Sequence, residues 1–110
     1  MSDLCDKTAV ELRRLIGRKD VSPVELLHSC IARIEATDSA LNAVVTRSFD
    51  RAREEAINAE KAVLNGEELG LLHGLPVGIK DLEATDGIRT TLGSQLYADH
   101  VPNKDQGSVA

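Results

Sequence analysis

Apolar residues recur at helical spacing through the first 66 residues and predict three helices separated by short turns. The first helix is about two to three turns long and begins after Thr8. Thr8 and Glu11 have the spacing of a capping box, in which each side chain accepts a hydrogen bond from the other residue's backbone N–H. Gly17 lies where a left-handed residue would end this helix.

The second helix has the clearest start in the sequence. Ser22 is suited to the N-cap, Pro23 to the first helical position, and Glu25 to a capping box. The turn-rich segment 37–39 predicts its end. Cys30 belongs to the apolar stripe of this helix, so we interpret it as a small core residue rather than a nucleophile. The other members of the stripe are Leu27, Ile31 and Ile34.

A third helix is predicted from Phe49 to Leu64, with Asn65-Gly66 after it. Its narrow apolar stripe is made mostly of alanines, which predicts close packing against a neighbour. The stripe consists of Phe49, Ala52, Ala56, Ala59 and Val63. Between the second and third helices, 41–46 is either a short strand or an extended connector.

From Gly70 onward the pattern changes to loops rich in glycine and proline. One strand is predicted at 76–80, with two shorter extended pieces at 88–91 and 96–97. A lone strand leaves its backbone groups unpaired, and 105–110 resembles the start of another helix. We therefore expect the chain to be the N-terminal piece of a larger protein.

Composition narrows the class of protein. Eighteen acidic against thirteen basic residues give a net charge of −5, which does not favour direct nucleic-acid binding. The two cysteines, Cys5 and Cys30, form no CxxC or Cys/His cluster, so no metal site, cofactor or disulfide framework is expected. The N-terminus lacks a signal-peptide pattern and no apolar run reaches the length of a membrane span. A cytoplasmic protein is expected.

The main chemical candidate is Lys80, which ends the apolar segment 72–80. Taken by itself, such a lysine would extend into solvent or pair with Asp81. The glycines before it do not form a phosphate-binding loop, because the GxxxxGK[ST] spacing is absent. Ser94 lacks the GxSxG context of a nucleophile elbow, and a trio of His73, Asp81 and Ser94 has nothing to bring it together.

Several segments together resemble the start of the amidase signature family. The match runs from about Ala9 onward. It is carried by Ser22-Pro23-Val24-Glu25-Leu26-Leu27, Leu41-Asn42-Ala43-Val44-Val45, His73-Gly74-Leu75-Pro76-Val77-Gly78-Ile79-Lys80-Asp81, Gly87-Ile88-Arg89-Thr90-Thr91-Leu92-Gly93-Ser94, and Val101-Pro102 with Asp105. The resemblance implies an α/β fold with a mixed sheet, incomplete in this chain, and amide hydrolysis by a serine–cis-serine–lysine triad. Lys80 matches the triad lysine.

A lysine with its ordinary pKa near 10.4 is a poor base at neutral pH. Burial against Leu75, Val77 and Ile79 is therefore expected to lower the pKa of Lys80. The resemblance places both triad serines downstream of the 110 residues, so the chain by itself is expected to hydrolyse nothing.

The resemblance leaves three functions open: the N-terminal part of a serine amidase acting on a small-molecule amide, the A subunit of a tRNA-dependent amidotransferase, or a small helical binding protein without catalysis. We favour the amidase. Residues 1–110 are then one part of a single amidase domain, helical over 8–66 and strand or loop over 70–110. The apolar helix faces also leave a homodimer open.

Overall fold

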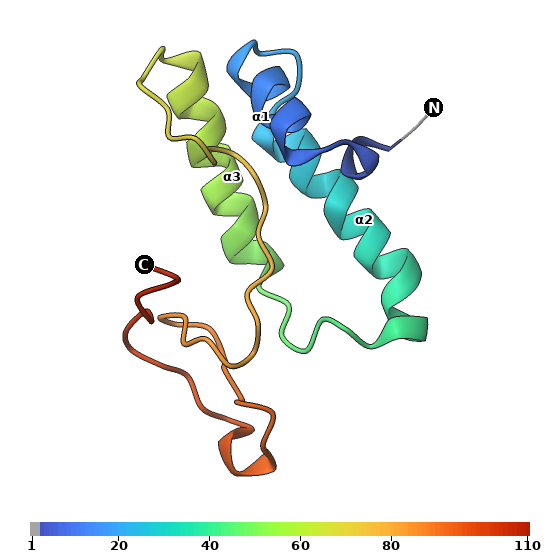
Figure 1. The fold of residues 1–110 in the computed structure, drawn as a ribbon, viewed down its shortest axis with the longest axis vertical. Coiled ribbons are helices and arrows are strands. Elements are labelled where there is room, and N and C mark those ends of the chain that lie inside the picture. Colours follow the sequence, from blue (N-terminus) through green and yellow to red (C-terminus); the bar gives the residue numbers. More distant parts are fainter. Residues whose placement is uncertain (1–2) are drawn as a thin grey trace. The chain divides into compact units, whose positions relative to one another are not determined.

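Three α-helices and two short 3₁₀ helices make up the regular structure of residues 3–110, the part of the chain that this computed structural model describes (Figure 1). In chain order they are η1 (Leu4–Asp6), α1 (Ala9–Gly17), α2 (Pro23–Leu41), α3 (Phe49–Leu64) and η2 (Gln95–Tyr97). The chain divides into two compact units. One comprises Met1–Asn42 with Phe49–Pro76, and the other comprises Ala43–Ser48 with Val77–Ala110.

The capping box predicted for α1 is confirmed. Thr8 Oγ1 accepts the Glu11 N–H at 3.2 Å, and the Glu11 carboxylate accepts the Thr8 N–H at 3.2 Å. The predicted left-handed end at Gly17 is wrong by two residues, because Lys19 has φ +66° instead. The N–H of Asp20 bonds to the Leu15 carbonyl, so the helix closes in a Schellman motif with Lys19 in the left-handed position.

The predicted N-cap and first residue of α2 are confirmed, since the Ser22 hydroxyl accepts the Glu25 N–H and Pro23 is the first helical residue. The predicted capping box is not formed, because the Glu25 carboxylate does not accept the Ser22 N–H. The predicted break at 37–39 is wrong, and the helix continues to Leu41. The Thr37 hydroxyl donates to the Arg33 carbonyl at 2.8 Å and is thereby accommodated within the helix. The helix ends where Asn42 adopts a left-handed conformation, so the connector begins there.

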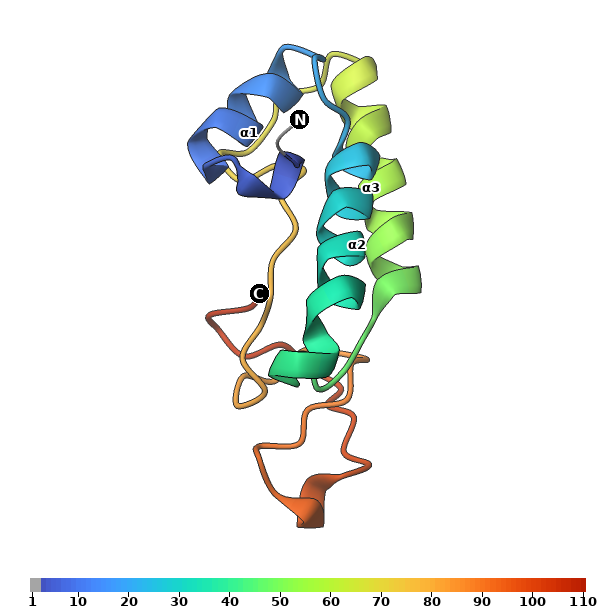
Figure 2. The same cartoon turned by 90° about the vertical axis from the view of Figure 1, so that its right-hand side faces the viewer.

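The bounds predicted for α3 are confirmed, and Gly66 follows it with φ +70°. The helix packs side by side with α2, as Figures 1 and 2 show. The stripe predicted to pack is shielded from solvent: Phe49 and the three alanines are half-buried, and Val63 is buried. This face of the helix is therefore the one turned away from solvent, as its apolar pattern predicted.

The helical unit has an aliphatic core. Its central buried cluster consists of Leu12, Ile16, Leu26 and Val63. Leu27 and Ile31 of α2 are buried as well. The segment after α3 returns to this core, where Leu75 is partly buried against it. The return is held by two hydrogen bonds, from Arg13 Nε to the Gly70 carbonyl at 3.0 Å and between His73 Nε2 and the Ala59 carbonyl at 2.9 Å.

No sheet is formed within residues 3–110, so the α/β assignment is not confirmed. Residues 76–80 are not part of a strand, since no described segment pairs with them. The extended piece predicted at 96–97 is wrong, because Ser94 caps the short helix η2 there. The only strand-like pairing in the described region is an isolated bridge between Thr85 and Ile88. At 106–110 the expected helix start is a single turn.

Candidate functional site

Lys80 lies at the point where an irregular extended segment meets a tight turn. Its carbonyl accepts the Glu83 N–H at 2.9 Å, which closes the turn. The side chain is exposed, and within the described part of the chain it makes no hydrogen bond or ion pair. The main chain at this lysine is therefore fixed, while its amine is free.

The predicted burial of Lys80 is not present in this structure. Val77 is 78% exposed and Ile79 is 42% exposed. Leu75, the third expected neighbour, packs instead on the core of the helical unit. The prediction assumed that Leu75, Val77 and Ile79 would together surround the lysine. Instead, no described helix or loop of the unit that contains Lys80 covers Val77 or Ile79.

The neighbouring Asp81 is bound to Thr91 rather than to the lysine. Its Oδ1 accepts the Thr91 N–H at 2.8 Å, and its Oδ2 accepts the Thr91 hydroxyl. The Asp81 carbonyl also accepts the Leu92 N–H at 2.9 Å. The bond from the Thr91 hydroxyl, then that from its N–H, lowers the pKa of Asp81 below its ordinary value, and the charge of Arg89 adds to this.

Further hydrogen bonds brace the loop that carries Thr91. Thr90 and Thr91 are buried, with 3% and 7% of their surface exposed. The Thr90 hydroxyl donates to the Ile88 carbonyl at 3.0 Å, and its N–H donates to the His100 carbonyl at 2.9 Å. Arg89 donates to the Ala98 carbonyl. Asp81 is thus bound to a loop whose own position is fixed by hydrogen bonds to the carbonyls of Ala98 and His100.

The trio of His73, Asp81 and Ser94 has no structural support, because each member has another partner. His73 bonds to the Ala59 carbonyl, and the Ser94 hydroxyl accepts the Leu96 N–H at 3.2 Å as a helix cap. Cys30 is half-buried against the core, as predicted for a packing residue. Burial, followed by the nearby Cys5 thiol, raises the pKa of Cys30, so it is not an activated nucleophile.

Within residues 3–110, no group of three or more His, Cys, Asp or Glu side chains is arranged to hold a metal ion. None of the described helices has the length and apolar character needed to cross a membrane.

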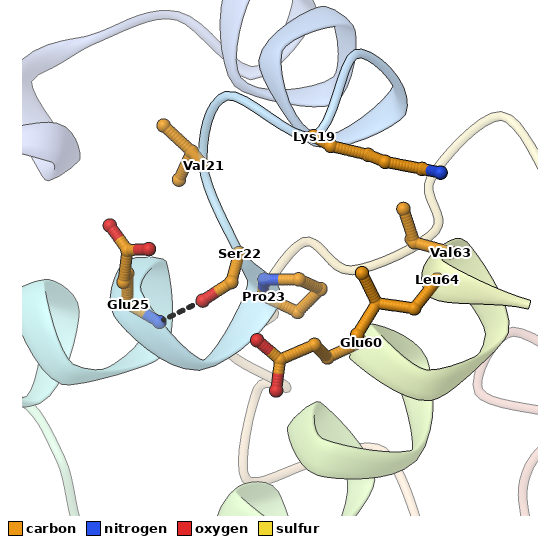
Figure 3. Close-up of a pocket in the computed structure, with 8 residues that line it drawn as sticks. All are labelled: Lys19, Val21, Ser22, Pro23, Glu25, Glu60, Val63 and Leu64. Atoms are coloured by element: carbon orange, nitrogen blue, oxygen red, sulfur yellow. Dashed lines mark hydrogen bonds between the residues drawn. The ribbon is translucent and has the colours of Figure 1, made fainter.

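A shallow pocket of about 190 Å³ lies where the start of α2 meets the end of α3 (Figure 3). Ser22 and Pro23 line one side, and Glu60 and Leu64 line the other. The Ser22 hydroxyl is used as the helix cap in this pocket, as the dashed line in Figure 3 marks. Its lining therefore consists of residues that build the junction between two helices, and it presents no nucleophile with a neighbouring base.

Sequence reasoning missed the pairing of Asp81 with Thr91. The simpler alternative for Lys80 was a salt bridge to Asp81, and the structure shows that carboxylate engaged elsewhere. A signal was present in the adjacent threonines ten residues later, since a buried threonine needs a partner for its hydroxyl.

Comparison with known proteins gives consistent results. A family model described as Amidase matches residues 25–110. The chain is 44% identical over 98 residues to the A subunit of the glutamyl-tRNA(Gln) amidotransferase of Moorella thermoacetica, covering 89% of this chain and 20% of that protein. It is 39% identical over 95 residues to the corresponding mitochondrial protein of Ornithorhynchus anatinus, covering 86% and 18%. The chain thus spans about a fifth of the length of these curated relatives.

Solved structures agree. A bacterial aryl acylamidase of the amidase signature enzymes family matches with a TM-score of 0.82 and 39% identity, over 86% of this chain and 20% of that one. A chain from a vestigial protein complex, described with the origins of an s-triazine catabolic enzyme, matches with a TM-score of 0.85 and 31% identity, over 90% and 22%. The chain therefore belongs to the amidase signature family.

Proposed function

We propose that the complete gene product is a serine amidase and that Lys80 is the base of its serine–cis-serine–lysine triad. The observation that carries the proposal is the family match over 25–110, which includes the motif ending in Lys80 and Asp81. The geometry supports it, since the Lys80 amine is free and the adjacent carboxylate is bound to Thr91.

The proposed chemistry transfers a proton from the nucleophilic serine, through the cis-serine hydroxyl, to the neutral Lys80 amine. The serine oxygen then attacks the amide carbon, and the C–N bond breaks as the proton passes to the leaving amine, which leaves an acyl-enzyme. Water then hydrolyses the acyl-enzyme, which releases the carboxylic acid and restores the serine hydroxyl. A lysine acts as a base only through its neutral amine, which burial favours, so the proposal requires Lys80 to be covered in the complete protein. The triad serines have no counterpart among the motifs of the 110 residues, and we expect these residues alone to be inactive.

Hydrolysis of 4-nitroacetanilide tests the proposal in the complete gene product, because an aryl acylamidase is among the similar structures. Lys80→Ala is expected to lower kcat by about 10²- to 10⁴-fold, the range for loss of a general base. Lys104→Ala replaces another exposed lysine of the same unit and is the matched control. Equal activity of the two variants would overturn the role of Lys80.

A second candidate is supported by the names of the curated relatives, which are glutamyl-tRNA(Gln) amidotransferase A subunits. In that case the protein would act as one component of an amidotransferase. Ammonia release from L-glutamine, without hydrolysis of 4-nitroacetanilide, would favour this function. Anilide hydrolysis without glutamine hydrolysis would favour the free-standing amidase.

The remaining proposals concern the substrate, the cellular compartment and the oligomeric state. We propose a small-molecule amide as the substrate and the cytoplasm as the compartment. A homodimer formed through the apolar helix faces stays a prediction, as does the assignment of residues 1–110 to a single domain.

A further inference from the structure

We propose that Thr91 prevents the Asp81 carboxylate from pairing with the Lys80 ammonium, and so keeps that lysine available as a base. This makes Thr91 a positioning residue, and the inference rests on the proposed function of Lys80. It concerns two adjacent residues with opposite charges, which would be expected to pair, and a buried threonine that holds one of them.

The geometry shows how Asp81 is held. Both carboxylate oxygens accept from Thr91, one from its N–H at 2.8 Å and the other from its hydroxyl. The Leu92 N–H holds the Asp81 carbonyl at 2.9 Å, so main chain and side chain are fixed to the same loop. Thr91 is only 7% exposed, and therefore water competes little for its hydroxyl.

The competition between partners favours Thr91. Thr91 gives the Asp81 carboxylate two hydrogen bonds, and hydrogen bonds to a charged acceptor are stronger than those between neutral groups. Removal of the Thr91 hydroxyl leaves Asp81 Oδ2 without that donor. The nearest cationic side chain along the chain is Lys80, one residue away.

An ion pair between Asp81 and Lys80 would make the lysine a less available base, because a nearby negative charge stabilises its protonated form. A carboxylate within about 4–6 Å favours the ammonium form, and each unit by which the pKa of a lysine rises lowers its neutral fraction about tenfold. The freed carboxylate would therefore move the acidic limb of the activity profile to higher pH.

Two other charged groups in this unit, Arg89 and Glu83, are already engaged. The Arg89 guanidinium, which acts electrostatically on Asp81, donates to the Ala98 carbonyl and to Thr46 Oγ1. The Glu83 carboxylate accepts the Ser108 hydroxyl at 3.0 Å. None of these contacts involves the Thr91 hydroxyl, so substitution there leaves them in place.

The test measures the pH dependence of serine labelling by a fluorophosphonate in the complete gene product, a readout that needs no knowledge of the substrate. Thr91→Val is expected to raise the midpoint of the acidic limb by about half a pH unit or more, equivalent to about a threefold loss of rate on that limb. Thr91→Ser keeps the hydroxyl and should restore the wild-type midpoint. Thr90→Val is the matched control, because it removes an adjacent buried hydroxyl that bonds to Ile88 instead.

Asp81→Asn gives a prediction of opposite sign. Loss of the negative charge should lower the midpoint, both alone and in combination with Thr91→Val. A loss of packing would not by itself raise the midpoint in Thr91→Val and lower it in Asp81→Asn. If Thr91→Val fails to fold, Asp81→Asn still tests the inference. Coincident midpoints for Thr91→Val and Thr90→Val, or a raised midpoint that persists in the double variant, would overturn the inference.

Lys80→Ala separates this inference from the proposed function. Unchanged labelling of Lys80→Ala would contradict the proposed function itself. Loss of labelling in Lys80→Ala, together with an unshifted Thr91→Val profile, would contradict only the role of Thr91.

Discussion

Gly74 lies directly against Pro23, where a Cβ atom added to the glycine would come within 3.0 Å of the proline Cγ. The same Cβ would lie 3.2 Å from Cδ1 of Ile16, a fully buried core residue. Gly74 also has φ +80°, a conformation that residues with a side chain rarely adopt. The glycine six residues before Lys80 thus has two structural reasons to be a glycine.

Gly74→Ala is expected to destabilise the helical unit through both effects. The left-handed conformation costs about 1–2 kcal/mol, and overpacking of the core adds about 1–3 kcal/mol. Gly66→Ala is the matched control, since Gly66 has φ +70° but nothing within 4 Å of the added atom. Urea unfolding followed by far-UV circular dichroism measures the difference. Equal losses in the two variants would show that the contact with Pro23 is unimportant.

Ser22→Ala is expected to lower the free energy of unfolding by about 1 kcal/mol, because the Glu25 N–H would lose its acceptor. The same urea experiment measures it. Ser39→Ala, at an exposed position of the same helix, should change stability by less than about 0.5 kcal/mol. A result in which Ser39→Ala costs as much as Ser22→Ala would contradict the assigned cap.

The pKa of Asp81 is predicted to lie below its reference value of 3.8, because Thr91 donates two hydrogen bonds to the charged form. The stabilisation from this carboxylate is therefore fully present above pH 3.8 and is lost as the pH falls through the lower, folded-state pKa. The Thr91 amide proton, followed by NMR, should titrate with that low midpoint, and Asp81→Asn should abolish the titration. A midpoint at or above 3.8 would contradict the hydrogen bonds.

Local signals along the chain predicted the helices well, because caps and apolar stripes act over a few residues. Thr8, Ser22 and the alanine stripe of 49–64 each behaved as their chemistry requires. The end of α2 was predicted wrongly. The Thr37 hydroxyl can bond to a carbonyl within a helix or to the backbone of a turn, and the sequence around it does not show which bond forms.

Features that depend on contacts between distant residues could not be predicted in this way. The strand expected at 76–80 needs a partner strand, and none is present in the described residues. The Asp81–Thr91 pair joins residues ten positions apart through a loop without regular structure, so no periodicity reveals it. The position of Lys80 at the end of an apolar segment drew attention to it, but only the family resemblance gave it a catalytic role.

The role of Lys80 is tested by fluorophosphonate labelling of the complete gene product at pH 8, with Lys80→Ala compared with Lys104→Ala. We expect labelling of one serine in the wild type and in Lys104→Ala, and a labelling rate at least about 100-fold lower in Lys80→Ala. Labelling of Lys80→Ala at the wild-type rate would contradict the central claim that this lysine activates the nucleophile.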